Sequence, residues 1–157
     1  MNFRIEILPE KKLVVLTKKM SISENKTFLL WNSFMKRKGE IQNAIGSDLF
    51  SIQIYESDYF DRFNPKKEFL KMAGVEITSF GNIPDRMEAF VLKSGKYAVF
   101  EYKGNPKNGG EAFQYIFQEW LPNSGFSLDN RPHFEILGTK YKNESDESEE
   151  EIWIPIK

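Results

Sequence analysis

The order of predicted elements occurs twice along this chain, and this repeat constrains the fold more than any other feature of the sequence. In each half, strand-like runs of alternating apolar and polar residues precede one amphipathic helix and two further strands. Four local matches support the repeat: Lys11–Leu16 with Gly95–Phe100, Phe34–Met35 with Trp120–Leu121, Ile52–Ile54 with Phe134–Ile136, and Val75–Ile77 with Ile152–Ile154. We therefore expect one α+β domain over residues 1–157, a duplicated β-α-β-β module with halves at approximately 1–83 and 84–157. The expected architecture is an antiparallel sheet with two main helices and a central ligand groove.

The first half is predicted to contain strands at 3–8, 13–20, 49–55 and 71–80, a helix at 24–37 and a polar connection at 56–68. The first two strands are close enough in sequence to form a hairpin. The hydroxyl groups of Ser21 and Ser23 can cap the helix by accepting hydrogen bonds from its free amide groups. The predicted apolar stripe of this helix contains Phe28, Leu30, Trp31, Phe34 and Met35.

The second half is predicted to contain strands at 87–92, 97–102, 133–139 and 151–156 and a helix at 111–121. A tight turn at Ser94–Gly95 predicts a hairpin between the first two of these strands. The run Asn143–Glu150 is strongly acidic. We expect a solvated hairpin loop there rather than a metal site.

Composition excludes several classes of function. The net charge is −1, so no basic excess is present to neutralise phosphates, and we expect no direct nucleic-acid binding. The absence of cysteine and the presence of one histidine exclude disulfides, thiol catalysis and multi-histidine metal sites. That histidine, His133, is expected at the surface or in a hydrogen bond, not as a catalytic base. We expect no cofactor, no membrane partner and, without an export signal, a cytoplasmic location.

Aromatic side chains make up 15% of the chain, as 14 Phe, 6 Tyr and 3 Trp. A domain of this size can bury only part of such a set in its core, so some rings should line a cavity or a groove. Tyr55, Phe80, Tyr97 and Trp120 are the candidate wall residues. Trp120 lies on the helix stripe and suits the core better, whereas Tyr97 can donate a hydrogen bond from its phenol.

Several segments carry a more specific signal. In the second half these are Gly95–Gly104, Glu119–Phe126 (Glu-Trp-Leu-Pro-Asn-Ser-Gly-Phe), Pro132–Glu135 (Pro-His-Phe-Glu) and Glu151–Ile156 (Glu-Ile-Trp-Ile-Pro-Ile). Together with Leu30–Met35 and Val75–Ile77 in the first half, they resemble the GyrI-like domain. This family is also called the AraC-type or bacterial transcription-activator effector-binding domain.

The resemblance implies helices on the outside of the fold and a central groove that binds hydrophobic or cationic compounds. Some members of the family follow a DNA-binding domain in multidrug-sensing regulators. Others stand alone, among them a gyrase inhibitor and hydrolases of DNA-alkylating cyclopropanoid natural products. The first predicted helix here already belongs to the repeat, and no DNA-binding segment precedes it, so we expect a stand-alone member.

Glu135 matches the acidic residue that regulator members of this family place in their ligand groove. It lies between Phe134 and Ile136 on a predicted strand, so its side chain should project away from these apolar neighbours. A carboxylate in an aromatic cleft would attract a cation, and burial would raise its pKa toward the range of a general acid or base. The alternative is a surface glutamate on an edge strand.

Glu151 and Trp153 share one face of the last predicted strand, as a cation-binding or proton-transferring pocket would require. The alternative is that Trp153 covers the edge of the core and Glu151 continues the acidic run. Tyr55 shares a face with Gln53, which the repeat matches to Glu135. Tyr55 is therefore the strongest candidate among the residues expected to line the groove.

Three functions stay open at this stage. The leading one is a module that senses or sequesters lipophilic, drug-like compounds, hydrophobic or cationic. The second is a hydrolase that opens strained rings, with Glu135 and Glu151 as the candidate catalytic groups. The third is a protein-interaction role such as gyrase inhibition, in which the acidic residues 144–151 mimic nucleic acid.

Overall fold

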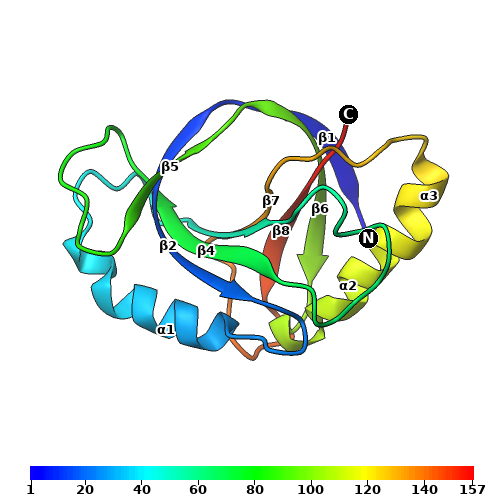
Figure 1. The fold of residues 1–157 in the computed structure, drawn as a ribbon, viewed down its shortest axis with the longest axis horizontal. Helices are drawn as coiled ribbons and strands as arrows, with labels where there is room; N and C mark the ends of the chain where they lie inside the picture. Colours follow the sequence, from blue (N-terminus) through cyan, green and yellow to red (C-terminus); the bar gives the residue numbers. More distant parts are fainter.

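Eight strands form a single antiparallel sheet that curls into an arch, with the helices on its outer side (Figure 1). The computed structural model describes residues 1–157. The strands are β1 (Phe3–Leu8), β2 (Lys11–Met20), β3 (Leu49–Ile54), β4 (Phe69–Glu76), β5 (Glu88–Leu92), β6 (Gly95–Lys103), β7 (His133–Leu137) and β8 (Glu149–Pro155). Their order in the sheet is β1-β6-β8-β7-β3-β4-β2-β5. The predicted α+β class is confirmed.

The two ends of the sheet are joined by one continuous two-stranded ribbon. β1 pairs with β6 at one end, and β2 pairs with β5 at the other. Leu8 lies opposite Gly95 and Lys11 lies opposite Leu92, so one antiparallel register runs through both pairs and the links between them. Figure 1 shows this ribbon passing over the top of the arch. The two halves of the chain therefore exchange strands and close the arch.

Both predicted hairpins are wrong, because β1 does not pair with β2 and β5 does not pair with β6. Apolar alternation identifies a strand but does not identify its partner. The links Pro9–Glu10 and Lys93–Ser94 carry each strand onward over the arch instead of reversing it. Pro9 has no amide hydrogen to donate, which suits a break between two ladders.

The space inside the arch is filled by side chains from every strand and from no helix. Eleven buried residues form this inner core: Leu8, Leu13, Val15, Phe50, Ile52, Met72, Leu92, Tyr97, Val99, Phe134 and Trp153. Consecutive residues of a strand point to opposite faces of the sheet. The sheet therefore has an inner face without a helix and an outer face that the helices cover.

Two helices cover the outer face. α1 (Thr27–Arg37) packs on β2 and β4, and the short turn η1 (Lys38–Glu40) follows it. After the turn η2 (Pro106–Asn108), the second helix runs as α2 (Gly109–Tyr115), the π-helical segment η3 (Ile116–Trp120) and α3 (Leu121–Ser124), and it packs on β6 and β8. None of these helices has the length and apolar character that crossing a membrane requires.

The start of α1 differs from the prediction. The helix begins at Thr27 rather than at residue 24, and no side chain caps it. Ser21 Oγ accepts a hydrogen bond from the Glu24 amide at 3.0 Å, but this bond closes a turn ahead of the helix. The predicted apolar stripe is buried only in part, since Phe28 is 78% exposed.

A pseudo-two-fold axis between β3 and β7 relates the two halves. If each strand of the first half is exchanged with its equivalent in the second half (β1 with β5, β2 with β6, β3 with β7 and β4 with β8), the strand order of the sheet is reproduced in reverse. Leu13 pairs with Glu76, and its counterpart Tyr97 pairs with Pro155. The predicted match of Glu76 with Trp153 is therefore wrong by two residues. Such a slip keeps every side chain on the same face, so apolar alternation cannot detect it.

The correct counterpart of Trp153 is Gly74. Phe50 pairs with Gly74 in the first half, as Phe134 pairs with Trp153 in the second. A Cβ atom at Gly74 would lie 2.6 Å from Val15 Cγ1, so no side chain fits there. The inner core thus has room for the indole ring on one side of the axis only.

The same register makes Ser51, not Gln53, the counterpart of Glu135. Ser51 and Glu135 lie directly opposite each other in the ladder between β3 and β7. Because Ser51 and Glu135 are equivalent in the two halves and also face each other in the ladder, the pseudo-two-fold axis passes between them. Glu135 therefore occupies the place where the two halves meet.

Candidate ligand-binding site

Glu135 lies at the centre of the outer face, between the two helices. In the ladder between β7 and β8, Glu135 lies opposite Ile152, which belongs to the apolar cluster under the second helix. Opposite residues point to the same face, so the Glu135 side chain also points to the outer face. The predicted orientation away from Phe134 and Ile136 is confirmed by the ladder. The alternative of a surface residue on an edge strand is wrong, because β7 is central and Glu135 is 9% exposed.

The carboxyl group of Glu135 is only partly satisfied. Gln53 Nε2 donates a long hydrogen bond of 3.5 Å to Oε1, and Oε2 has no partner. The group takes part in no ion pair. Burial raises the pKa of Glu135 above its ordinary value, and Lys71 and Gln53 offset this only in part. Glu135 is thus a buried acid whose ionised form has no counter-charge in contact.

Six ring side chains, which we call the aromatic cover, form one cluster on this face. They are Tyr55, Tyr59, Phe60 and Phe69 from β4 and the connection before it, Phe117 from η3 and His133 from β7. Phe60 stacks on Phe117 with the ring centroids 5.1 Å apart, and on His133 at 5.4 Å. The aromatic cover therefore links the two halves across the axis.

Tyr55 and His133 place the aromatic cover beside Glu135. His133 precedes Glu135 by two residues on the same face of β7, and Tyr55 meets His133 edge to face at 5.0 Å. Burial, and then the charge of Glu135, raise the pKa of the Tyr55 phenol. The structure thus brings Tyr55 and Glu135 together.

The predicted surface position of His133 is wrong, and its side chain makes no hydrogen bond. It is 5% exposed, because Phe60 and Phe117 pack over it. Burial, with a smaller contribution from Arg131, lowers the pKa of His133 to about 3. The imidazole is therefore neutral near pH 7 and acts as a ring in the cluster.

The connection between β3 and β4, residues 55–68, has few polar ties to the rest of the protein. One backbone hydrogen bond reaches it, from Ser23 N to Pro65 O at 2.9 Å. Its ion pair between Lys67 and Asp58 is internal. Phe63, in the same connection, is 79% exposed and adds little packing. The rings of the aromatic cover therefore supply most of the contact between residues 55–68 and the rest of the protein.

Glu151 and Trp153 lie on the inner face, on the other side of the sheet from Glu135. Their predicted shared strand face is confirmed, since Trp153 Nε1 donates a hydrogen bond to Glu151 Oε1 at 3.1 Å. Arg4 Nη2 donates to Glu151 Oε2 at 2.6 Å, which neutralises the carboxylate. Trp153 stacks on Phe134 within the inner core. One groove therefore cannot contain both glutamates, because the ladder puts them on opposite faces.

The other predicted wall residues also lie away from Glu135. Tyr97 is buried in the inner core and donates a hydrogen bond from its phenol to the Pro132 carbonyl at 3.0 Å. Trp120 meets Phe100 edge to face at 4.8 Å under the second helix, the core position that its helix stripe indicated. Phe80 is 41% exposed and lies beyond the end of β4. None of the three has a ring contact with the aromatic cover.

Glu150 is a candidate that the sequence reasoning missed. The acidic run predicts a solvated loop there, but β8 begins at Glu149, and the ladder puts Glu150 on the outer face with Glu135. Burial and the charge of Glu135 raise the pKa of Glu150 to about 7. Ile152 and Ile154 lie on one face of the strand, and the same alternation continued by two residues toward the N-terminus would have placed Glu150 on that face.

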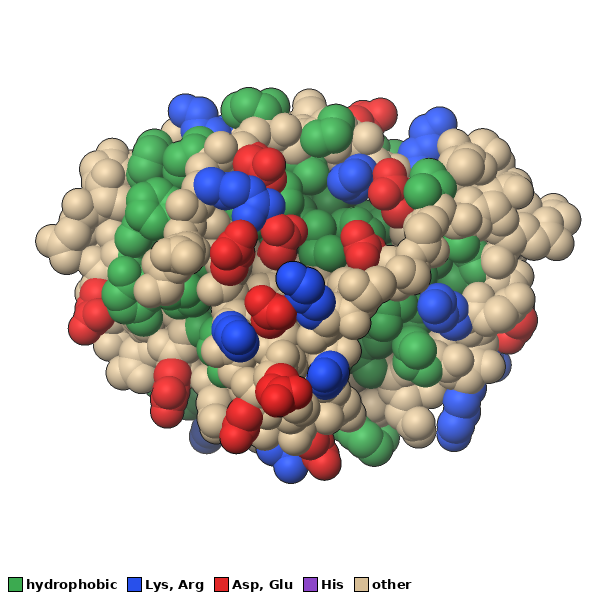
Figure 2. Space-filling model, turned by 180° about the vertical axis from the view of Figure 1, so that it is seen from behind, with side chains coloured by type: hydrophobic (Ala, Val, Ile, Leu, Met, Phe, Trp, Pro, Cys, Tyr) green, Lys and Arg blue, Asp and Glu red, His purple; other side chains and the backbone are tan.

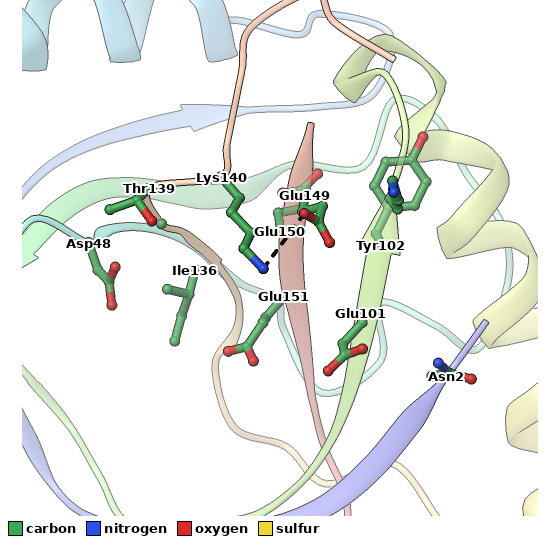
Figure 3. A pocket seen from close by; sticks show the side chains of 12 residues that line it. Asn2, Asp48, Glu101, Tyr102, Ile136, Thr139, Lys140, Glu149, Glu150 and Glu151 are labelled. Atoms are coloured by element: carbon green, nitrogen blue, oxygen red, sulfur yellow. Dashed lines mark ion pairs between the residues drawn. The ribbon is translucent and has the colours of Figure 1, made fainter. Parts of the chain in front are cut away.

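A polar cavity of about 570 Å³ opens beside Glu150 (Figure 3). The cavity lies where β7 separates from β8. The ladder between β7 and β8 ends at Glu151, whereas β8 stays paired with β6 as far as Glu149. Its acidic lining residues are Asp48, Glu101, Glu149, Glu150 and Glu151, and its basic ones are Lys103 and Lys140. No three acidic or histidine side chains of the chain are grouped so as to hold a metal ion.

Comparisons with known proteins agree with this architecture. The transcriptional regulator BrlR of Pseudomonas aeruginosa is 29% identical over 128 residues, which are 81% of this chain and 45% of BrlR. The chain thus spans about half the length of this relative. The structure of SAV2435 bound to tetraphenylphosphonium has a TM-score of 0.78 at 18% identity, covering 100% of this chain and 94% of that one. A hydrolase encoded by lin2189 of Listeria innocua has a TM-score of 0.61 at 12% identity, covering 99% and 91%.

These structural likenesses show a shared fold. The family assignment rests on a sequence model, described as the GyrI-like small molecule binding domain, that matches residues 1–157. The resemblance inferred from the sequence motifs is thereby confirmed, and this chain belongs to the family of GyrI-like small molecule binding domains.

Proposed function

We propose that this protein binds lipophilic organic cations over Glu135, on the outer face of the sheet between α1 and the second helix. The observation that carries the proposal is the unpartnered Oε2 atom of a carboxyl group that is 9% exposed. A buried polar atom without a partner costs about 1–3 kcal/mol, and a buried unpaired charge costs more. A positively charged ligand in contact with Oε2 would remove that cost.

The aromatic cover supports the choice of a lipophilic cation. Its rings offer apolar surface, and each ring face within reach of a cation contributes about 0.5–2 kcal/mol. His133 stays neutral near pH 7, so it does not repel such a ligand. The complex of SAV2435 with tetraphenylphosphonium, a lipophilic monocation, supports the same ligand class on a similar fold.

Binding requires the aromatic cover to open, because Phe60 stacks where a ligand would approach His133 and Glu135. The few polar ties of residues 55–68 keep the cost of this movement low. Separating the stacked pairs of Phe60 with Phe117 and His133 costs about 1 kcal/mol each. The ligand's own rings would replace these contacts.

The direct test is calorimetric titration with tetraphenylphosphonium and with triphenylphosphine oxide, a neutral compound of similar shape. We expect the cation to bind and the neutral compound to bind at least about tenfold more weakly. Equal affinity for the two would show that charge has no role. Absence of cation binding would end the proposal.

We also propose that the protein senses such compounds in the cytoplasm, by analogy with the transcriptional regulator BrlR. In this role the chain makes no direct contact with nucleic acid. The net charge is −1, and Figure 2 shows basic side chains mixed with acidic ones over the middle of the molecule seen from behind. Such a surface offers no continuous basic track for a phosphate backbone.

Hydrolysis of strained rings is the second candidate, favoured by one observation. The raised pKa of Glu135 lets the carboxyl group keep a proton that a general acid could donate beside aromatic rings. Glu151 cannot share this chemistry, because it lies on the other face of the sheet. Incubation with a cyclopropanoid alkylating agent should then give turnover in the wild type and in Glu151→Gln, and none in Glu135→Gln.

A further inference from the structure

β1 is one edge of the sheet, and the row of side chains on its outer face is apolar and largely uncovered. Phe3, Ile5 and Ile7 form this row and are 49%, 40% and 68% exposed. The ladder identifies the face, because Phe3 lies opposite Phe100, which packs under the second helix. Edge strands usually carry charges or proline that prevent pairing with another chain. The outer row of β1 carries neither, so this edge is suited to a partner.

The backbone of β1 has free hydrogen-bonding groups at the same edge. Glu101 N donates to Asn2 O at 3.1 Å, so Asn2 and the even-numbered residues after it exchange hydrogen bonds with β6. The N–H and C=O groups of Phe3, Ile5 and Ile7 therefore point away from β6, toward the open edge. A strand added there would extend the sheet by hydrogen bonds as well as by apolar contacts.

The sequence of β1 is complementary to itself when two copies run antiparallel. If Ile5 lies opposite Ile5 of a second copy, then Phe3 lies opposite Ile7. In the same register Arg4 lies opposite Glu6, and both of these side chains reach solvent. Each of the unlike pairs occurs twice because the arrangement is symmetric. Apolar residues thus meet on one face of the joined sheet, and opposite charges meet on the other.

The other edge of the sheet, β5, lacks this complementarity. The pseudo-two-fold axis matches residues 4–6 of β1 with Glu88, Ala89 and Phe90 of β5. Two copies of β5 in the equivalent register would place Glu88 opposite Phe90, a charge against a ring. Charge complementarity therefore favours β1 as the edge that pairs with a second copy.

A hollow of about 420 Å³ beside β1 fits the same arrangement. Its apolar lining residues are Phe3, Tyr115, Trp120 and Phe126. In the antiparallel register, Ile7 of the second copy lies next to Phe3 on the outer face, where its side chain can enter the hollow. By symmetry both copies of Ile7, the most exposed residue of the row, are then covered.

We propose that this protein forms a symmetric dimer in which β1 pairs antiparallel with β1 of a second copy. The interface is short, so its dissociation constant is expected in the micromolar range. β1 is at the edge of the sheet, whereas Glu135 lies on β7 at its centre. Dimer formation is therefore independent of ligand binding over Glu135.

The test is sedimentation velocity of the wild type, Ile5→Lys and Ala89→Lys at protein concentrations up to about 500 μM. We expect the wild type to change from monomer to dimer as the concentration rises. Ile5→Lys places two ammonium groups opposite each other on the symmetry axis, so its dissociation constant should rise at least about tenfold. Ala89→Lys adds the same charge at the equivalent, exposed position of β5 and should dimerise like the wild type.

Cross-linking checks the register, because the chain contains no cysteine of its own. A short bismaleimide should join two copies of Ile5→Cys and leave Ala89→Cys as a monomer. Thermal unfolding checks that each variant keeps its fold, and if Ile5→Lys does not, the cysteine pair decides the question.

A wild type that stays monomeric at every concentration overturns the inference and leaves β1 to a strand of a different protein. Dimerisation that Ile5→Lys does not weaken overturns it too, as does equal weakening by Ala89→Lys, which would indicate a general effect of positive charge. Equal cross-linking of the two cysteine variants would likewise show that β1 is not the interface.

Discussion

The two faces of the central sheet each hold a glutamate next to aromatic rings, and the two glutamates differ in how their charge is compensated. On the inner face, Glu151 accepts hydrogen bonds from Arg4 at 2.6 Å and from the indole of Trp153 at 3.1 Å. On the outer face, Glu135 has one long contact to Gln53 and a free Oε2 atom. Residue types alone do not distinguish these two sites.

The partners of a charge, more than its surroundings, separate a structural site from a binding site. The Glu151 carboxylate is already neutralised by Arg4, so it offers a ligand little. Glu135 is more deeply buried and lacks a counter-ion, which is the arrangement that perturbs pKa values at functional sites. The following predictions separate the two faces.

The largest effect is expected on stability, from Trp153→Ala on the inner face. Trp153 is 6% exposed and stacks on Phe134, so its truncation should lower the free energy of unfolding by about 3–5 kcal/mol. The affinity of the folded protein for tetraphenylphosphonium should stay within about threefold of the wild type. Urea denaturation and calorimetry measure the two quantities. A large loss of affinity in a folded Trp153→Ala variant would contradict the separation of the faces.

The next effect is on binding, from Glu135→Gln. Loss of the buried counter-charge should weaken tetraphenylphosphonium binding by about 3 kcal/mol, roughly 100-fold. The matched control, Glu151→Gln, loses a half-exposed ion pair with Arg4, so affinity should not change and stability should fall by at most about 1 kcal/mol. Fluorescence titration of both variants checks this, and the reverse pattern would assign the ligand to the inner face.

A smaller effect is expected from opening the aromatic cover. Phe60→Ala removes the ring stacked on Phe117 and His133, so the association rate constant for tetraphenylphosphonium should rise by about fivefold. Phe63→Ala is the control in the same connection, since Phe63 is 79% exposed and should leave the rate unchanged. Stopped-flow fluorescence measures both. A slower association in Phe60→Ala would show that Phe60 is a wall of the site rather than its cover.

The sequence predicted the elements of the fold better than their pairing. Alternation and helical periodicity located all eight strands and both main helices. The two predicted hairpins were wrong, because period-two alternation carries no information about partners. For the same reason the repeat matched Gln53 to Glu135, although Ser51 is the counterpart.

The candidate site was predictable only in part. The family motif identified Glu135, and the proximity of Tyr55 followed from its strand face. The aromatic cover comes from a polar, irregular connection, in which no periodicity marks Phe60 as a contact of His133. Glu150 was hidden because an acidic run and the start of a strand overlap there.

In the proposed complex, Glu135, whose Oε2 atom is unpaired in the free protein, becomes the counter-ion of the ligand, so binding of a cation should release a proton. Burial raises the pKa of the free Glu135 carboxyl, and a bound cation favours its ionised form. Below the raised pKa, binding must therefore release a proton, and affinity must increase with pH until it levels off above that pKa. Glu150 has a pKa of about 7 and could release a proton of its own, so the measurement is made in a Glu150→Gln background.

Calorimetric titration with tetraphenylphosphonium between about pH 5 and pH 8, in buffers of different ionisation enthalpy, counts the protons. We expect proton release that persists in a variant also carrying Glu151→Gln and disappears when Glu135→Gln is added instead. Proton release that is unchanged by Glu135→Gln, or an affinity that does not depend on pH, would show that Glu135 is not the counter-ion of the ligand.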